Sequence, residues 1–336
     1  MENTRRLIEK LKTDGLLSNI AIRVAKKDNI LAELYSDGID SKTMFDMASV
    51  TKVIVTTTVS LIAINENKLN ITDKVCQFFE VPEWYRELTV FNLLTHTMGI
   101  GHKNLTVIGN DYDNIVGYIL SLKDNDIGKE VEYSCPAFIL LGKILEKIYG
   151  KKLDILFKEK VALPLGLKSS GFKPDTSKYN FVNSNIDKEK IGIVNDYNCQ
   201  FLGGVAGNAG LFSNIEDVST FVNMLLNGGT PLFQKSVLDM ASKNYTNDMS
   251  KSRGLGFLYV DGRYKQTGEL FPSGSIGHCG HTGTSVFLDR ESGLYVIILS
   301  DATISTVKKY GKENYDEVIQ MREDLHNAIK EDLGAL

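Results

Sequence analysis

The segment that most constrains the fold is a mostly apolar run over residues 53–64, which directly follows Lys52. This run has no regular polar face, so a helix formed here is buried on most of its sides. Other elements of the chain must therefore surround it. A turn of small residues over positions 45–50 precedes the run and places Ser49 near the start of the helix.

Ser49 has two interpretations. A serine at a helix start is usually an N-cap, because its hydroxyl accepts a hydrogen bond from an otherwise unpaired backbone N–H. Alternatively, Ser49 and Lys52 lie three residues apart and share one face of the helix, so the amine approaches the hydroxyl. Burial of that face would lower the pKa of the lysine and make Lys52 a base for a serine nucleophile. The Ser-x-x-Lys spacing alone does not decide between the two.

The composition restricts the classes of function. The chain has 336 residues and a formal net charge of −4, which gives no basic footprint for nucleic acid. No run of about 18 apolar residues predicts a membrane span. Residues 1–10 lack the apolar core of a secretory signal, so we expect a cytoplasmic protein. The expected partner is a small-molecule or short-peptide substrate, and the sequence leaves the oligomeric state open.

No metal or other cofactor is predicted. His278 and His281 lie three residues apart, but neighbouring glycines disfavour a helix and no acidic ligand follows at a recognised spacing. The cysteines lie far apart without C-x-x-C spacing, and we expect four free thiols. These are Cys76, Cys135, Cys199 and Cys279.

The periodicity predicts strands near both ends of the chain and helices between them. A hairpin is predicted over residues 19–35 and an antiparallel meander over residues 254–300. Amphipathic helices are predicted over residues 3–12, 88–95, 136–149, 153–161, 215–226 and 315–333. We therefore predict an α+β fold, in which helices from both termini flank an antiparallel β-sheet and a mainly helical lobe is inserted. The predicted boundaries are 1–66 and 201–336 for the sheet domain and 67–200 for the helical domain, with the active site in the cleft between them.

Three further stretches carry alternatives. Tyr133 precedes a predicted helix and is either a packing residue or a phenol whose pKa nearby cations lower, so that it transfers protons. Residues 281–284 (HTGT) form either a surface turn or a strand edge that holds substrate, with the backbone N–H groups of Thr284 and Ser49 facing an oxyanion. The glycine-dense residues 203–210 match no nucleotide loop and predict a backbone packed closely against its neighbours.

Together these stretches resemble one family, the serine β-lactamase and penicillin-binding-protein superfamily, and within it the class C-like branch of D,D-peptidases and esterases. Three of its motifs appear in order: S-x-x-K as Ser49-Val50-Thr51-Lys52, Y-x-N or Y-S-x as Tyr133-Ser134-Cys135, and K-T-G or H-T-G as His281-Thr282-Gly283. Residues 93–100 (LLTHTMGI) and 207–217 look like two further segments of that branch, and the resemblance extends over residues 19–300.

The resemblance implies a β-lactamase/transpeptidase-like fold and a role for each motif. Ser49 would be the acylated nucleophile, Lys52 would help to remove its proton, and Tyr133 would act as general base and then protonate the leaving group. The N–H groups of Ser49 and Thr284 would form the oxyanion hole. The positions Cys135, His281, Thr282 and Gly283 would contact substrate.

Two departures from the family pattern affect the expected substrate. Cys135 stands where many members have asparagine, and a thiol makes only weak hydrogen bonds to a substrate amide. His281 replaces the lysine of K-T-G and is only partly charged at neutral pH, so it is a poorer anchor for a carboxylate. These departures favour small acyl esters or D-amino-acid peptides and amides. His96 is expected to hold a loop by hydrogen bonds.

Three alternatives remain open at this point. One is a class C-like β-lactamase. The second is a penicillin-binding sensor that is acylated without turnover. The third is a cysteine hydrolase that uses Cys135, for which the sequence shows no evident histidine partner.

Overall fold

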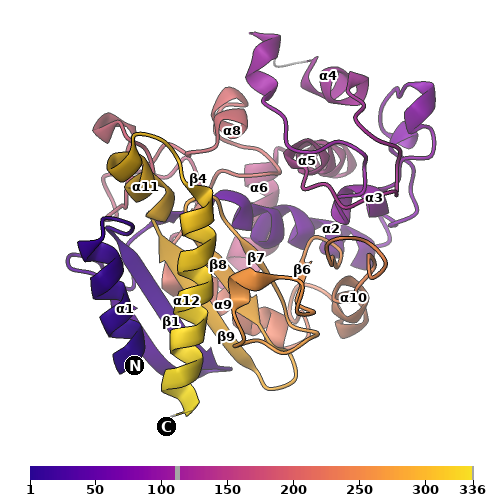
Figure 1. Cartoon of the computed structure of the whole chain (residues 1–336). Coiled ribbons are helices and arrows are strands. Elements are labelled where there is room, and N and C mark those ends of the chain that lie inside the picture. The colour runs from indigo at the N-terminus through magenta and orange to yellow at the C-terminus, as the bar shows by residue number, and fades with distance from the viewer. Residues whose placement is uncertain (110–113, 335–336) are drawn as a thin grey trace.

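A six-stranded antiparallel sheet joins segments from both ends of the chain (Figure 1). The computed structural model describes residues 1–109 and 114–334. The strand order is β2-β1-β9-β8-β7-β6. The strands are β1 (Ile20–Lys26), β2 (Asn29–Tyr35), β6 (Leu258–Tyr259), β7 (Ile276–Cys279), β8 (Ser285–Leu288) and β9 (Leu294–Ser300). The predicted hairpin and the antiparallel sheet are confirmed, and the contact between β1 and β9 brings the two ends of the chain together.

Alternate residues of the sheet face two different cores. Ile20, Ile22 and Val24 of β1 belong to a smaller core on the side of α1 (Glu2–Thr13) and α12 (Tyr315–Gly334). Figure 1 shows these two helices side by side across one face of the sheet, where they make many contacts with each other. Residues of β1 with the opposite parity, such as Ala21, face the larger core. The period of two in the sequence therefore corresponds to burial on both faces of the sheet.

The central helix occupies the larger core, as its apolar sequence predicts. It starts with a 3-10 turn (Ala48–Val50), continues as a π-helical segment (Lys52–Thr57) and ends as α2 (Thr58–Asn65). Ser49 caps none of these segments, because no side-chain cap hydrogen bond forms at their first residues. The N-cap interpretation of Ser49 is therefore wrong. Residues 48–65 are long and apolar enough to cross a membrane, but 83% of this window is buried inside the protein, as is usual for a core helix.

The middle of the chain is mainly helical. Its helices are α3 (Val90–Leu94), α4 (Ile115–Ser121), α5 (Cys135–Tyr149), α6 (Leu153–Phe157), α7 (Leu163–Leu165) and α8 (Tyr197–Phe201). The Thr89 side chain caps α3, and the Ser134 side chain caps α5, which ends at Gly150 in the left-handed conformation. A small sheet, in the order β3 (Phe45–Asp46), β5 (Leu211–Ser213) and β4 (Gly171–Phe172), joins this part to the turn before Ser49. The domain boundaries at 66 and 200 stay a prediction.

The remaining helices lie in the C-terminal third of the chain, and one predicted strand there is shorter than expected. The helices are α9 (Ile215–Leu226), α10 (Lys235–Ala241) and α11 (Ala302–Tyr310). The meander predicted from residue 254 has its first strand only at Leu258, as β6. The reason is that the N–H groups of Leu255 and Gly256 donate to the carbonyls of Ala241 and Leu94, and not to a neighbouring strand.

Candidate active site

The Lys52 side chain is fully buried and uses all three of its donor positions. Its Nζ lies 3.0 Å from Ser49 Oγ, 3.0 Å from the carbonyl oxygen of Asn208 and 3.4 Å from Cys135 Sγ. The π-helical segment that begins at Lys52 continues the face that carries Ser49, so the amine and the hydroxyl meet as their spacing predicts. Ser49 itself stays half-exposed. A buried amine is thus held beside an accessible hydroxyl.

The glycine-dense segment supplies one of the three acceptors of Lys52. Its backbone packs directly on the central helix, since Thr56 Oγ1 donates to the carbonyl of Gly207 at 2.7 Å. On the other side, a Cβ at Gly207 would collide with the carbonyl oxygen of Phe138 in α5. The close packing predicted for this segment is confirmed. It fixes the carbonyl of Asn208 at the position where that carbonyl binds Lys52.

Tyr133 lies next to two cations. Lys52 Nζ is 4.8 Å and Arg253 Cζ is 5.8 Å from the centroid of its ring. The hydroxyl oxygen of Tyr133 is buried and has no hydrogen-bond partner among the residues that the structure describes. Burial raises the pKa of Tyr133 well above its usual value, and the nearby Ser49 hydroxyl and Arg253 only partly oppose this effect. The prediction of neighbouring cations is confirmed, whereas the prediction of a lowered pKa is wrong because desolvation outweighs the cations.

His96 holds the loop that carries Tyr133. Its Nδ1 accepts a 3.0 Å hydrogen bond from the backbone N–H of Ser134, and its ring lies 4.9 Å from the ring of Tyr133. Burial, with Arg253 and Lys52 nearby, keeps the pKa of His96 well below its usual value. The ring is therefore neutral at neutral pH and can accept this bond. The structural role predicted for His96 is confirmed.

Cys135 shares the site with Lys52 and has a second basic neighbour. Burial opposes ionisation of its thiol, but the Lys52 ammonium and the His102 imidazole together lower the pKa of Cys135 below its usual value. Hydrogen bonding to Cys135 in turn raises the pKa of His102. The expectation that Cys135 has no histidine partner is wrong, because the loop after α3 brings the two residues together. No sequence spacing links them.

A cavity of about 760 Å³ opens beside Ser49. Ser49, Tyr133 and Cys135 all border it. The other polar residues of its wall are His102, Asn104, Asn195, Asp196, Tyr197, Asn198, Lys251, Arg253, Tyr264, Gln266, His278, His281, Glu313 and Tyr315. This volume is sufficient for a small acyl compound or a short peptide.

The predicted substrate-binding motif His281-Thr282-Gly283 borders the cavity only through His281. Among the described residues, Thr282, Gly283 and Thr284 are not part of the cavity wall. The Thr282 hydroxyl donates instead to the carbonyl of Asp46 at 3.1 Å, and a Cβ at Gly283 would collide with Ser300 Oγ. These groups stabilise the turn between β7 and β8, and their contact with substrate stays a prediction.

Strand β7, which precedes this turn, lies at the cavity wall, where the His281-Thr282-Gly283 motif was expected. His278 and Cys279 of β7 border the cavity, and the rings of His278 and Tyr133 are 6.1 Å apart. A Cβ at Gly280 would lie 2.8 Å from the carbonyl oxygen of Met47, so this end of β7 lies directly against the turn that carries Ser49. The sequence contains two His-x-Gly patterns three residues apart, and the first of them lies at the cavity wall.

Neither histidine provides a free positive charge. Burial, Lys52 and Arg253 hold the pKa of His278 well below its usual value, so its ring is neutral. His281 is partly exposed, its Nε2 lies 3.1 Å from Glu313 Oε2, and its ring stacks on Tyr315. No group of three or more metal-ligating side chains occurs in the described part of the chain.

The antiparallel sheet with helices on both faces and a Ser–Lys pair at the cavity is the arrangement of the β-lactamase/transpeptidase fold class. The model of the family described as "Beta-lactamase" matches residues 4–318, and the chain belongs to this family.

Comparisons with named proteins agree with this membership. The chain is 28% identical over 308 residues to a "Putative D-alanyl-D-alanine carboxypeptidase" of Escherichia coli (strain K12), covering 79% of this chain and 70% of that protein. It is 25% identical over 301 residues to an "N-acetylmuramyl-L-alanine amidase" of Bacillus subtilis (strain 168), covering 78% and 68%. The solved structure of "EstCE1, a hydrolase with promiscuous acyltransferase activity" has a TM-score of 0.74 at 17% identity, covering 97% of this chain and 98% of that one. The similarity to the EstCE1 structure concerns the fold alone.

Proposed function

We propose that the protein is a serine hydrolase that acts through an acyl-enzyme on small acyl esters or on D-amino-acid peptides and amides. The observation that carries this proposal is the 3.0 Å contact between the buried Lys52 Nζ and the accessible Ser49 Oγ at the wall of the cavity. Membership of the β-lactamase family and the relatives named above support hydrolysis as the general reaction. Ser49 is preferred over Cys135 as nucleophile because the thiol is only 2% exposed.

In the proposed mechanism, Lys52 in its amine form accepts the proton of Ser49 as the oxygen attacks the carbonyl carbon. Its other two contacts, with Asn208 and Cys135, keep the amine pointed at that oxygen. Tyr133 is protonated at neutral pH because its pKa is raised. It therefore gives its proton to the leaving group and recovers one from Lys52, and water then hydrolyses the acyl-enzyme.

The negative charge of the tetrahedral intermediate requires backbone donors. We propose that the N–H groups of Ser49 and His281 provide them. The N–H of Thr284, expected from the sequence, is a poorer candidate because Thr284 lies outside the cavity wall, whereas His281 follows Gly280 against the Ser49 turn. Loss of one such donor typically costs about 3 kcal/mol of barrier.

Replacement of the nucleophile tests the proposal. We expect Ser49→Ala to abolish hydrolysis of a p-nitrophenyl ester while the circular dichroism spectrum and the Tm stay near those of the wild type. Cys135→Ala is the comparison: it removes one contact of Lys52 and should lower turnover without abolishing it, because the contact with Asn208 remains. Retained activity in Ser49→Ala with loss in Cys135→Ala would instead assign the reaction to a cysteine hydrolase.

The intact mass of the protein after incubation with a penicillin distinguishes the closest alternatives. A lasting adduct on Ser49 indicates a penicillin-binding sensor or a slow peptidase. Rapid formation and loss of that adduct indicates a β-lactamase. Absence of an adduct, together with ester hydrolysis, indicates an esterase.

A further inference from the structure

Cys135 combines three features of a reactive thiol. It is the first residue of α5, where the helix dipole favours a negative charge. Lys52 Nζ lies 3.4 Å from its sulfur, and the imidazole of His102 forms a hydrogen bond with it. Cys135 and His102 both border the cavity beside Ser49. Thiols at a helix start beside basic groups react with oxidants, whereas thiols in apolar surroundings are inert.

The other cysteines lack an amine neighbour. Cys76 is exposed, and Cys199 points to a backbone carbonyl. Cys279 borders the same cavity as Cys135, but its basic neighbours are arginines. A guanidinium stays protonated and has no free electron pair with which to form a bond to sulfur. In residues 1–109 and 114–334, Cys135 is thus the cysteine that a lysine amine contacts, and this amine is the one that binds Ser49.

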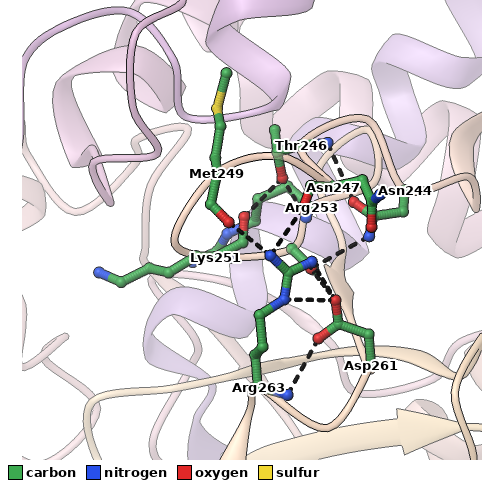
Figure 2. Close-up of polar contacts among 9 residues, drawn as sticks. Asn244, Thr246, Asn247, Met249, Lys251, Arg253, Asp261 and Arg263 are labelled. Carbon is green, nitrogen blue, oxygen red and sulfur yellow. Dashed lines mark hydrogen bonds and ion pairs between the residues drawn. The ribbon is translucent and has the colours of Figure 1, made fainter.

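The cavity gives small molecules a way to Cys135, although the side chain is only 2% exposed. One wall of the cavity is held in place by Arg263, which pairs with Asp261 and donates to the carbonyls of Asn247 and Met249 at 2.9 and 2.6 Å (Figure 2). This wall is therefore formed before any small molecule enters. An oxidant close to the size of water meets the sulfur more easily than a larger reagent does.

We propose that hydrogen peroxide converts Cys135 and Lys52 into a reversible covalent pair, in which Sγ and Nζ are joined as a sulfenamide. The flexible side chain of Lys52 closes the remaining gap by rotation about its carbon–carbon bonds. The amine then no longer accepts the proton of Ser49, so the link switches the site off. This last consequence rests on the proposed hydrolase function, whereas formation of the link does not.

The link forms in two balanced steps. In the first, the sulfur attacks one oxygen of hydrogen peroxide, an S–O bond forms and the O–O bond breaks. The leaving hydroxide takes the thiol proton and becomes water, so sulfur is oxidised and the peroxide is reduced. In the second, Lys52 in its amine form attacks the sulfur of the sulfenic acid, as nitrogen groups near such acids do. The S–N bond forms, the S–O bond breaks, and hydroxide leaves with one amine proton as water. External thiols reverse the link by way of a mixed disulfide.

Peptide mapping after peroxide treatment tests the link. Cys76→Ser is the parent protein, because it removes the exposed thiol. We expect its intact mass to fall by about 2 Da through loss of two hydrogen atoms, and trypsin to stop cleaving after Lys52. A disulfide gives the same mass change but joins two cysteines. The decisive result is therefore a joined pair of peptides that contain Lys52 and Cys135 and separate on treatment with a thiol reductant.

Three variants in this parent sharpen the test. Cys279→Ser removes the other buried thiol of the cavity wall and should form the link as the parent does. Cys135→Ser should form no link, and peroxide should inactivate it at least about tenfold more slowly than the parent. Lys52→Arg should instead gain about 16 or 32 Da at Cys135, because the oxidised sulfur meets no amine. A parent that shows this gain without joined peptides, or a link to a residue other than Lys52, overturns the proposal.

Mass and activity together separate this inference from the hydrolase function. The link should also form in Ser49→Ala, where no turnover is expected. If the joined peptides appear but the untreated wild type hydrolyses no ester, the hydrolase proposal fails and the modification stands. If the wild type hydrolyses the ester and peroxide leaves Lys52 and Cys135 unjoined, the modification fails and the hydrolase proposal stands. Recovery of ester hydrolysis by the reductant, in parallel with separation of the peptides, identifies the link as the cause of inactivation.

Discussion

The backbone N–H of Ser134 donates a 3.0 Å hydrogen bond to Nδ1 of His96, and this bond joins the loop after α3 to the first turn of α5. It lies one residue from Tyr133, the proposed proton donor. His96 also has a backbone φ of +58°, in the left-handed region that asparagine tolerates and alanine does not. Both properties make His96 a positioning residue for Tyr133.

We therefore expect His96→Ala to lower kcat at least about tenfold with little change in KM. It should also lower the stability by about 1–3 kcal/mol, because the Ser134 N–H loses its buried acceptor. His96→Asn keeps an acceptor at the same distance from the backbone and should restore most of both quantities. Ester hydrolysis and urea unfolding measure the two effects. Equal losses in the two variants would contradict the positioning role.

A second prediction concerns Asp46, which precedes the Ser49 turn. The carboxylate accepts hydrogen bonds from the N–H groups of Ala48 and Asn195, but burial prevails and raises its pKa to about 6. The folded protein then binds a proton that the unfolded chain, with a usual aspartate pKa of about 4, has already lost. The resulting stabilisation is complete below about pH 4 and is lost as the pH rises through about 6.

Comparison with Asp46→Asn isolates this contribution, because the amide cannot titrate. Relative to that variant, the wild type should lose up to about 3 kcal/mol of unfolding free energy between pH 4 and pH 7. Urea unfolding at several pH values measures the difference. A difference that grows in favour of the wild type with rising pH would contradict the raised pKa.

A third prediction concerns two cysteines at the same cavity. The pKa of Cys135 is lowered, whereas burial raises the pKa of Cys279. Both thiols are nearly inaccessible, so iodoacetamide at pH 7.5 should react slowly with either. Because the thiolate is the reactive form, Cys135 should still be modified before Cys279. Modification should stop ester hydrolysis by filling the space next to Lys52. Cys135→Ala should be resistant to inactivation, and Cys279→Ala should not. Peptide mass mapping identifies the modified residue, and faster labelling of Cys279 would refute the prediction.

The glycine segment gives a fourth prediction. Gly207→Ala would push a Cβ into the carbonyl of Phe138 and displace the backbone that binds Thr56 and Lys52. We expect a loss of about 1–3 kcal/mol in stability and a large loss of kcat. Gly171→Ala is the control, since a Cβ there meets no atom within 4 Å and its φ is not positive. Similar behaviour of both variants would exclude a role for the close packing.

The sequence predicted the elements that have clear periodicity. The hairpin, α9 and α12 lie close to their predicted bounds, because each buries one regular face. The pairing of Ser49 with Lys52 was predictable from helical spacing. The contact of Lys52 with Cys135 also fits the motif order, although the distance of 3.4 Å between Nζ and Sγ had to come from the structure.

Other parts of the site follow from long-range packing and leave no pattern in the sequence. His278 and His281 both precede an x-Gly pair and both border the cavity, and only the end of strand β7 determines which of them lies next to the ring of Tyr133. His102 and Arg253 belong to no motif, and loops bring them to the cavity. The raised pKa of Tyr133 was also unpredictable, because it depends on how completely the fold removes water from its hydroxyl.

The contacts of Arg263 have a consequence for one wall of the cavity. The Arg263 guanidinium ties the loop that carries Lys251 and Arg253 to Asp261, while Ser49 and Lys52 belong to the central helix. The wall of the cavity and the Ser–Lys pair are therefore held by separate sets of contacts, so a change in the loop can reshape the cavity without moving the pair.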